Sequence, residues 1–256
     1  MEGSYRMEQL KGRELHIYLP PSYHHGECSY PVMYLQDAGE VMQQGLNFLE
    51  HLMLTGQLPE LILIGIQPHE RRDEYTPWPA PPILSGGKGF AGQGESYLEE
   101  LVHVIKPYMD ASFRTIPDAK HTGIGGCSLG GLISLYAYYQ YPDVFGRLAW
   151  LSTSFWYEKL ISYIHEQPLP EGEHRIYMYV GELEGIYKTN IQRQMVSSTK
   201  EAYQLLSQKG LSSHQLKFET DPMGTHDDIF FGRYFPEALK WLFRAEQLQG
   251  GDSNAD

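Results

Sequence analysis

The chain has 256 residues, of which 41% are hydrophobic and 20% are charged, so it can bury one large core. Its 20 Lys and Arg residues against 32 Asp and Glu residues give a formal net charge of −12, which argues against nucleic acid as a partner. An anionic small molecule would need a local basic patch. We expect a single domain over 1–249 and a disordered polar tail, GGDSNAD, at 250–256.

The amino-terminal segment contains no apolar run typical of a signal-peptide core, and no stretch of about 18 apolar residues occurs in the chain. We therefore expect a cytoplasmic protein with no membrane partner. Cys28 and Cys127 are the two cysteines, which excludes a disulfide framework and a four-thiolate zinc site. We expect both to be free thiols.

Apolar runs of strand length alternate along the chain with amphipathic segments. The expected strands are 13–19, 32–36, 61–66, 121–127, 147–152, 175–180 and 215–220. The expected helices are 45–54, 95–110, 129–140, 190–209 and 233–247. Several strands lack polar alternation, as expected for strands that are covered on both faces. The pattern predicts an α/β fold with a mostly parallel central sheet and helices on both faces.

Residues 67–94 form a Pro- and Gly-rich connection that is far longer than the usual loop of about 4–6 residues. We interpret it as a loop that covers a pocket, and a plain surface excursion is the alternative. Its segment 87–92, GKGFAG, matches G-x-G-x-x-G. Because a Pro-rich loop precedes this match instead of a strand, we expect no dinucleotide site and no cofactor.

A candidate nucleophile lies at the junction of an expected strand and an expected helix. Residues 126–130, Gly-Cys-Ser-Leu-Gly, match G-x-S-x-G between strand 121–127 and helix 129–140. This is the strand–turn–helix setting of a nucleophile elbow, in which a strained serine lifts its hydroxyl above the sheet. The helix amino terminus then directs free N–H groups at the reaction centre. We expect Ser128 to be the nucleophile.

A serine nucleophile needs a general base, and in this fold the base follows the serine in the sequence. His226 lies in the loop DPMGTHDD, between strand 215–220 and the last helix, where active-site residues of α/β proteins gather. We therefore expect His226 to be the base. The flanking Asp227 and Asp228 are weak candidates for metal ligands, but we expect no metal.

The carboxylate that orients the histidine is expected after strand 175–180, where the chain reads GELEG. Glu184 lies far enough along this loop to turn toward His226, and we favour it. Glu182 remains a candidate because it is close to the strand end, and Asp227 or Asp228 is a remote third choice.

These motifs together resemble the putative-esterase (esterase D) branch of the α/β-hydrolases, and within it the enterochelin esterase-like hydrolases of siderophore trilactones. The likeness covers most of the chain through RELHIYLPPSY, YPVMYLQDAGE, LILIGI, RRDEYTPWP, GGCSLGGL, SFW, VGELE and GTHDD. GGCSLGGL followed by YPDVFG is fairly specific for this branch. The resemblance implies an α/β-hydrolase fold with an N-terminal antiparallel hairpin, and it makes Ser128 the nucleophile, His226 the base and Glu184 the acid.

The resemblance also implies an oxyanion hole built from backbone N–H groups. Leu129 supplies one donor. The second lies in the segment Asp37-Ala38-Gly39, where the family often shows His-Gly or Asp-Gly. Ala38 and Gly39 are both candidates, and we favour Gly39.

The resemblance implies a serine esterase that acts through an acyl-enzyme, with a small-molecule ester, possibly an iron-siderophore, as substrate. The ester would be a siderophore trilactone of the enterobactin or bacillibactin type, iron-loaded or metal-free. The alternatives are a general or feruloyl/acyl carboxylesterase and, remotely, a non-catalytic binding protein of the same fold.

Substrate contacts are expected from the stretch RRDEYTPW, which combines cations with aromatic rings. The expected contacts are Arg71, Arg72, Tyr75, Trp78 and Trp156, with Lys88 as a further cation at the rim. The alternative is that the two arginines pair with Asp73 and Glu74 on a solvated loop.

Overall fold

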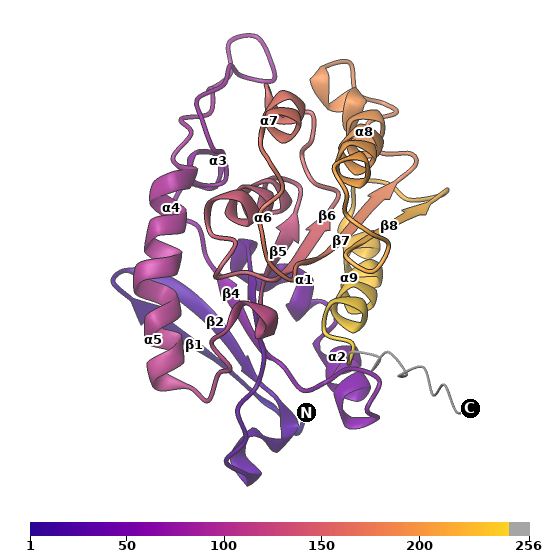
Figure 1. Ribbon diagram of the computed structural model, residues 1–256. Coiled ribbons are helices and arrows are strands. Elements are labelled where there is room, and N and C mark those ends of the chain that lie inside the picture. Colours follow the sequence, from indigo (N-terminus) through magenta and orange to yellow (C-terminus); the bar gives the residue numbers. More distant parts are fainter. Residues whose placement is uncertain (246–256) are drawn as a thin grey trace, which may run out of the picture.

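The computed structural model describes residues 1–245, which form an α/β fold around one eight-stranded sheet (Figure 1). The strands are β1 (Ser4–Leu10), β2 (Arg13–Leu19), β3 (Val32–Leu35), β4 (Ile62–Ile66), β5 (Thr122–Cys127), β6 (Arg147–Leu151), β7 (Arg175–Gly181) and β8 (Leu216–Asp221). Their spatial order is β1-β2-β4-β3-β5-β6-β7-β8. The pairs β1–β2 and β2–β4 are antiparallel and the remaining neighbours are parallel, which confirms the predicted α/β-hydrolase fold.

The amino-terminal hairpin uses a strand that the sequence pattern did not reveal. β1 pairs along its whole length with β2, and the two strands are joined at Lys11 and Gly12, both of which have positive φ. The side chains of β1 are half-buried or exposed because it is the edge strand of the sheet. It therefore lacks the apolar run on which the other strand predictions rested.

The helices agree with the predicted segments, except for three helices that were not predicted and for the starts of α8 and α9. The α-helices are α1 (Glu40–Gln43), α2 (Leu46–Leu54), α3 (Arg71–Glu74), α4 (Gly94–Glu100), α5 (Lys106–Ser112), α6 (Leu129–Gln140), α7 (Leu160–Glu166), α8 (Met195–Gln208) and α9 (Asp228–Leu242). A π-helical turn, Leu101–Ile105, joins α4 to α5. The short helices α1, α3 and α7 were not predicted. α8 begins five residues after the predicted start at 190, because a 3-10 turn, Ile191–Gln194, precedes it. α9 begins five residues before the predicted start at 233 and continues through Pro236.

The expected tail at 250–256 and the last residues of the predicted helix 233–247 lie outside the described residues. Within residues 1–245, every helix is too short or too polar to cross a membrane.

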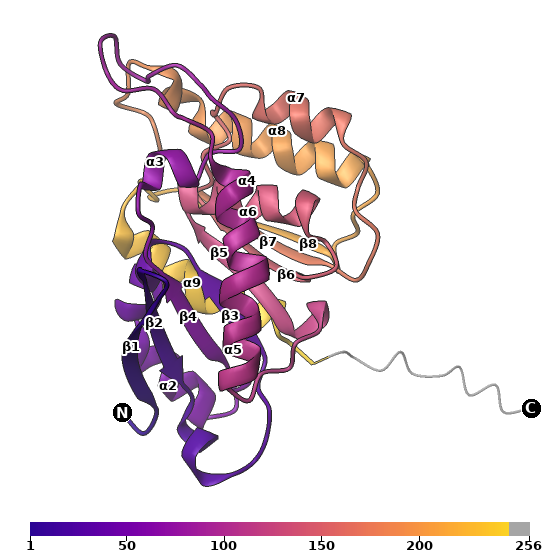
Figure 2. The ribbon, with the colours of Figure 1, turned by 90° about the vertical axis from the view of Figure 1, so that its left-hand side faces the viewer.

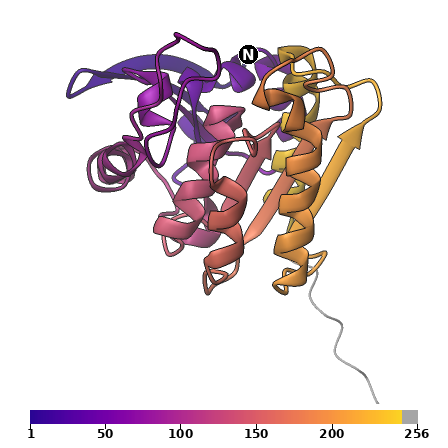
Figure 3. The same ribbon diagram turned by 90° about the horizontal axis from the view of Figure 1, so that it is seen from above.

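Helices cover both faces of the sheet (Figures 2 and 3). α4 to α8 lie on one face, and α2 and α9 lie on the other. Alternate residues of β3 show the two layers, because Tyr34 packs into the first apolar cluster while Met33 and Leu35 pack into the second. Strands that are buried on both faces explain the continuous apolar runs in the sequence.

The long connection 67–94 is folded against the body of the protein. It begins with the short helix α3, and Ala80 pairs with Phe90 in an isolated antiparallel bridge. The segment 87–92, which matches the dinucleotide motif, spans the second half of this small hairpin. Loop residues and the bridge at Ala80 precede the segment where the motif requires a strand, and α4 begins two residues after it, at Gly94.

Candidate active site

Ser128 lies at the turn between β5 and α6, at the carboxyl end of the parallel strands. Its backbone is strained, with φ 58° and ψ −117°, and its N–H donates to the carbonyl oxygen of Leu151 at 3.0 Å. A Cβ added at Gly131 would lie 2.2 Å from Thr153 Oγ1, so only glycine fits between the helix and the strand there. The sequence thus forms the sharp turn that presents the Ser128 hydroxyl in front of the helix amino terminus.

His226 and Glu184 are joined by a short hydrogen bond. His226 Nδ1 lies 2.6 Å from Glu184 Oε2, and the Glu184 side chain is 0% exposed. The other oxygen, Oε1, accepts from Ser152 Oγ at 2.5 Å and from the Gly181 N–H at 2.8 Å. With a proton on Nδ1 facing the carboxylate, Nε2 of the imidazole is left as an acceptor.

The other carboxylates that were candidates for this position lie elsewhere. Glu182 is exposed and faces Lys200, with 3.8 Å between Oε1 and Nζ. Asp227 accepts from Thr225 Oγ1, and Asp228 begins α9 and lines the cavity in front of Ser128. The structure therefore brings Glu184, and not Glu182, against His226.

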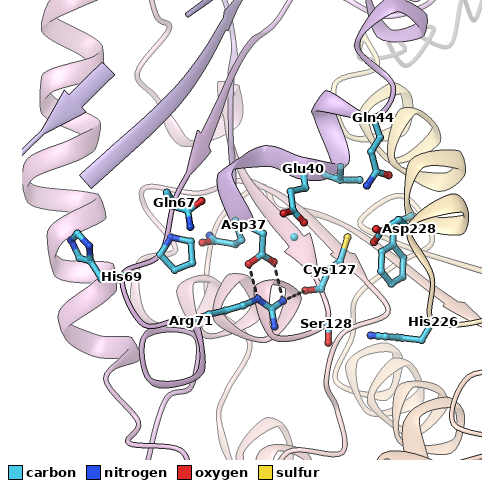
Figure 4. Close-up of a pocket in the computed structure, with 15 residues that line it drawn as sticks. Asp37, Glu40, Gln44, Gln67, His69, Arg71, Cys127, Ser128, His226 and Asp228 are labelled. Atoms are coloured by element: carbon cyan, nitrogen blue, oxygen red, sulfur yellow. Dashed lines mark hydrogen bonds and ion pairs between the residues drawn. The ribbon is translucent and has the colours of Figure 1, made fainter. Parts of the chain in front are cut away.

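Ser128 and His226 face each other across a common cavity (Figure 4). The imidazole points toward Ser128, whose Oγ lies 3.3 Å from Ser154 Oγ. Ser154 is fully buried, and its N–H donates to the Ser128 carbonyl oxygen at 3.1 Å. No role was expected for either Ser152 or Ser154, although Ser152 ends the predicted strand 147–152 and Ser154 lies two residues after it, where site residues gather.

The cavity has a volume of about 520 Å³ and a wall that is rich in carboxylates. Asp37, Glu40 and Asp228 line it, and Arg71 is the one Arg or Lys side chain among its described lining residues. Arg71 Nε and Nη2 bind the two oxygens of Asp37 at 2.6 and 2.9 Å (Figure 4). Burial lowers the pKa of Arg71, but the hydrogen bonds and charge of Asp37 outweigh it and raise that pKa above its usual value.

The carboxylates Asp37 and Glu40 line the cavity, although neither was expected there from the sequence. Asp37 lies two residues after β3, so its position at the carboxyl end of a central strand was an available signal. Asp37 and Ala38 both have positive φ, at 55° and 53°, in the tight turn that follows the strand. This turn places the Asp37 carboxylate beside the elbow.

The expected oxyanion donors differ in their availability. Leu129 is the first residue of α6, where backbone N–H groups have no partner within the helix. The Gly39 N–H, which we favoured as the second donor, is already bonded to the Gln36 carbonyl oxygen at 3.0 Å. The structure contradicts the choice of Gly39, because the 3-10 turn Asp37–Gly39 uses that N–H internally.

The other expected substrate contacts do not line this cavity. Tyr75 is 0% exposed and accepts from the Asp37 N–H at 2.8 Å, and Trp156 is 6% exposed within the core. Trp78 packs against aromatic rings of α6 and α7, and its Nε1 donates to the Glu158 carbonyl oxygen at 2.8 Å. Tyr75 therefore supports the cavity wall through Asp37, whereas Trp78 and Trp156 pack against residues outside the cavity lining.

The remaining expected cations are turned away from the cavity. Arg72 stacks over Phe90 and donates to the Lys88 carbonyl oxygen, while Lys88 pairs with Asp73 at 2.9 Å. Glu74 pairs instead with the buried Arg13 at 2.9 Å. Arg71 and Arg72 thus form no ion pair with Asp73 or Glu74, in contrast to the alternative interpretation.

The two cysteines are free thiols, as predicted: Cys28 is exposed, and Cys127 lines the cavity beside Ser128. Burial raises the pKa of the Cys127 thiol, so this thiol stays protonated. Within residues 1–245, no group of three or more His, Cys, Asp or Glu side chains is placed to hold a metal ion.

Comparison with known proteins identifies the family to which the chain is similar. A model of the family described as "Putative esterase" matches residues 9–242. A Bacillus subtilis (strain 168) protein, "Uncharacterized protein YbbA", is 37% identical over 243 residues, which cover 95% of this chain and 97% of that protein.

Solved structures share the fold at low identity. An IroE-like serine hydrolase from Shewanella oneidensis has a TM-score of 0.81 at 21% identity, over 95% of this chain and 82% of that chain. The enterobactin esterase FES from Shigella flexneri has a TM-score of 0.72 at 17% identity, over 94% of this chain and 59% of that chain.

Proposed function

The chain belongs to the family described as "Putative esterase", and from this premise we propose that it is a serine carboxylic ester hydrolase that works through an acyl-enzyme. The observation that carries the proposal is the 2.6 Å bond between His226 and the fully buried Glu184, in front of a strained Ser128. A buried carboxylate on one side of an imidazole and a serine hydroxyl on the other is the arrangement that activates a serine.

In the proposed reaction, Ser128 Oγ attacks the ester carbonyl carbon while His226 Nε2 takes the hydroxyl proton. The carbonyl oxygen becomes an oxyanion, and the collapse of this intermediate expels the alcohol, which receives the proton from His226. Water then attacks the acyl-enzyme with His226 again as base, and the carboxylic acid leaves. Glu184 stays ionised and stabilises the imidazolium at both stages.

The oxyanion would be held by backbone N–H groups. Leu129 N–H at the start of α6 is the first donor, because it combines a free N–H with the positive end of the helix. With Gly39 engaged by Gln36, we assign the second donor to the Ala38 N–H, the alternative that the sequence left open.

The proposed substrate is a siderophore trilactone. The chain shares its fold with proteins described as enterobactin esterase, siderophore hydrolase and IroE-like serine hydrolase, which supports this class. The cavity volume of about 520 Å³ lies within the range of roughly 300–1,000 Å³ that is usual for small-molecule sites.

The charge of the wall favours a metal-free trilactone over its ferric complex. Asp37, Glu40 and Asp228 outnumber Arg71, whose charge is already neutralised by Asp37. A ferric tricatecholate is an anion that such a wall repels, whereas the metal-free ligand keeps its phenolic hydroxyls protonated at neutral pH and is neutral.

A hydrolysis panel combined with active-site labelling tests the proposal. The panel contains a metal-free trilactone, its ferric complex, a feruloyl ester and a short p-nitrophenyl ester, and a fluorophosphonate probe reports on the reactive serine. We expect labelling of wild-type protein, its loss in Ser128→Ala, and fastest turnover of the metal-free trilactone.

Each contrary result has a definite meaning. Preference for the feruloyl or p-nitrophenyl ester would replace the trilactone by a simpler ester. A protein that neither labels nor hydrolyses any panel member would be a binding protein with an inactive hydrolase fold.

A further inference from the structure

A second cavity, of about 820 Å³, lies at the opposite end of the sheet from Ser128. Its walls come from residues just before β3, β4 and β5 and from the first residues of β6 and β7, Arg147 and Arg175. The end of α9 contributes Leu242 and the residues that follow it. Within the described chain, the two cavities have no lining residue in common.

The lining of this second cavity is strongly basic, although the whole chain has a net charge of −12. Its cations are Lys120, Arg147, Arg175, Lys240 and Arg244. Among the lining residues within 1–245, the single carboxylate is Glu60, and both of its oxygens are bonded to Ser22. Lys120 and Lys240 form ion pairs at 3.9 and 2.5 Å with Glu173 and Glu237, which do not line the cavity, so the proposed site rests on Arg175 and Arg244.

Arg175 and Arg244 are bonded to neutral carbonyl oxygens. Arg175 Nη1 donates to the Leu242 and Arg244 carbonyl oxygens at 3.1 and 2.8 Å, and Arg244 Nη2 donates to the His214 carbonyl oxygen at 3.1 Å. These bonds hold both side chains in place without cancelling their charge. A guanidinium has five N–H donors, so each retains further donors for a ligand.

The two guanidinium groups also repel each other. Burial and the charge of Arg175 lower the pKa of Arg244 below its usual value. An anion between like charges removes this repulsion, and a buried or partly buried cation pair is more favourable with such a ligand than without it. Leu58, Leu242 and Phe243 add apolar surface for the carbon skeleton of an organic anion.

We propose that this cavity binds a small organic polyanion, a molecule that carries at least two phosphate or carboxylate groups. Arg175 and Arg244 form charge-assisted hydrogen bonds with one anionic group. Lys240 also lines the cavity and would exchange its ion pair with Glu237, at 2.5 Å, for one with the second anionic group. The site is independent of the esterase chemistry, because the sheet separates it from Ser128, Glu184 and His226.

Isothermal titration calorimetry with pyrophosphate and with citrate at constant ionic strength tests the proposal. We expect binding of at least one probe with a Kd below about 1 mM. Binding of pyrophosphate alone would identify a phosphate ligand, and binding of citrate alone would identify a carboxylate ligand. The absence of heat with both probes at about 10 mM would overturn the proposal.

Arg244→Gln and a matched control locate the binding. Arg244 stacks over the Trp241 ring, and Arg114 likewise stacks on an aromatic ring, that of Tyr23, and donates to a carbonyl oxygen, but Arg114 does not line the cavity. We expect Arg244→Gln to weaken binding at least about tenfold and Arg114→Gln to change it less than about twofold. Equal weakening in both variants would mean a diffuse charge effect and no site.

Esterase activity and thermal unfolding of Arg244→Gln show whether the variant is folded. If it does not fold, Lys240→Gln replaces it, because the partly exposed Lys240 side chain contributes charge with little packing. Retained esterase activity together with lost anion binding would separate this site from the proposed active site. Unchanged anion binding in folded Lys240→Gln and Arg244→Gln would overturn the proposal.

Discussion

The two ends of the central sheet differ in charge and in backbone strain, although the same strands run between them. At the carboxyl end, Asp37, Ala38, Ser128 and Ser152 follow strands and have positive φ, and the cavity wall is acidic. At the amino end, arginines are bonded to carbonyl oxygens and the wall is basic. The difference shows that net charge governs long-range attraction, while the local charge of a cavity wall can differ in sign between the two ends of one sheet.

The largest expected effect comes from substitution of Ser128, which should abolish hydrolysis at the carboxyl end of the sheet and leave anion binding at the amino end unchanged. We expect Ser128→Ala to lower kcat by about 10⁴–10⁶-fold, because the remaining groups cannot replace the attacking oxygen. Citrate or pyrophosphate binding at the amino end should stay unchanged in titrations of the same variant. A variant with wild-type hydrolysis would refute the assignment of Ser128.

The carboxylate pair in the GELEG loop provides the next largest effect. Glu184→Gln should lower kcat by about 10³–10⁴-fold, because the amide neither fixes the imidazole tautomer nor stabilises its cation. Glu182→Gln is the matched control and should change kcat less than about twofold, since it alters an exposed ion pair. Small and equal effects in steady-state kinetics would indicate a Ser128–His226 pair that works without an acid.

Close packing at the carboxyl end is tested by adding one methyl group. Gly131→Ala should lower the free energy of unfolding by about 1–3 kcal/mol, because its Cβ would lie 2.2 Å from Thr153 Oγ1. In Gly26→Ala the added Cβ meets no atom within 4 Å, and we expect a change below about 0.5 kcal/mol. Urea unfolding of both variants measures the difference, and equal stabilities would contradict this account.

The smallest effect concerns the cation in the acidic cavity. Arg71→Ala removes the neutralising partner of Asp37, so kcat/KM for a ferric trilactone should fall about 5–10-fold and that for a neutral p-nitrophenyl ester less than about twofold. Arg72→Ala should leave both values within about twofold, because Arg72 lies outside the cavity. Parallel losses on both substrates would show that Arg71 acts on folding.

Much of the fold follows from local pattern. Strands that are covered on both faces have continuous apolar runs, and their predicted positions agree with the structure to within one residue at each end. β1 was missed because an edge strand exposes its side chains. The start of α9 was placed too late because Gly232 weakens the helical pattern, while packing of Phe231 and Phe235 holds that first part of the helix.

The site was predictable where a residue's place follows from the strand order. Ser128, Glu184 and His226 each follow a parallel strand, so all three lie at the carboxyl end of the sheet. The cations were not predictable in this way. Arg71 and Arg72 are neighbours, yet α3 directs one to Asp37 and the other to Phe90, and only tertiary packing decides between these partners.

The pairing of β3 has a consequence for how the chain folds during synthesis. Val32 pairs with Ile62 on one side and with Thr122 on the other, so one edge of this central strand stays open until β5 has been made. Long-range parallel pairing is slow, and an open apolar edge invites aggregation in the meantime. The strand that closes this edge, β5, ends at Cys127, directly before Ser128. Ser128 therefore reaches its strained turn only after β5 has paired with β3, and the carbonyl oxygen that holds its N–H, that of Leu151, belongs to the next strand, β6.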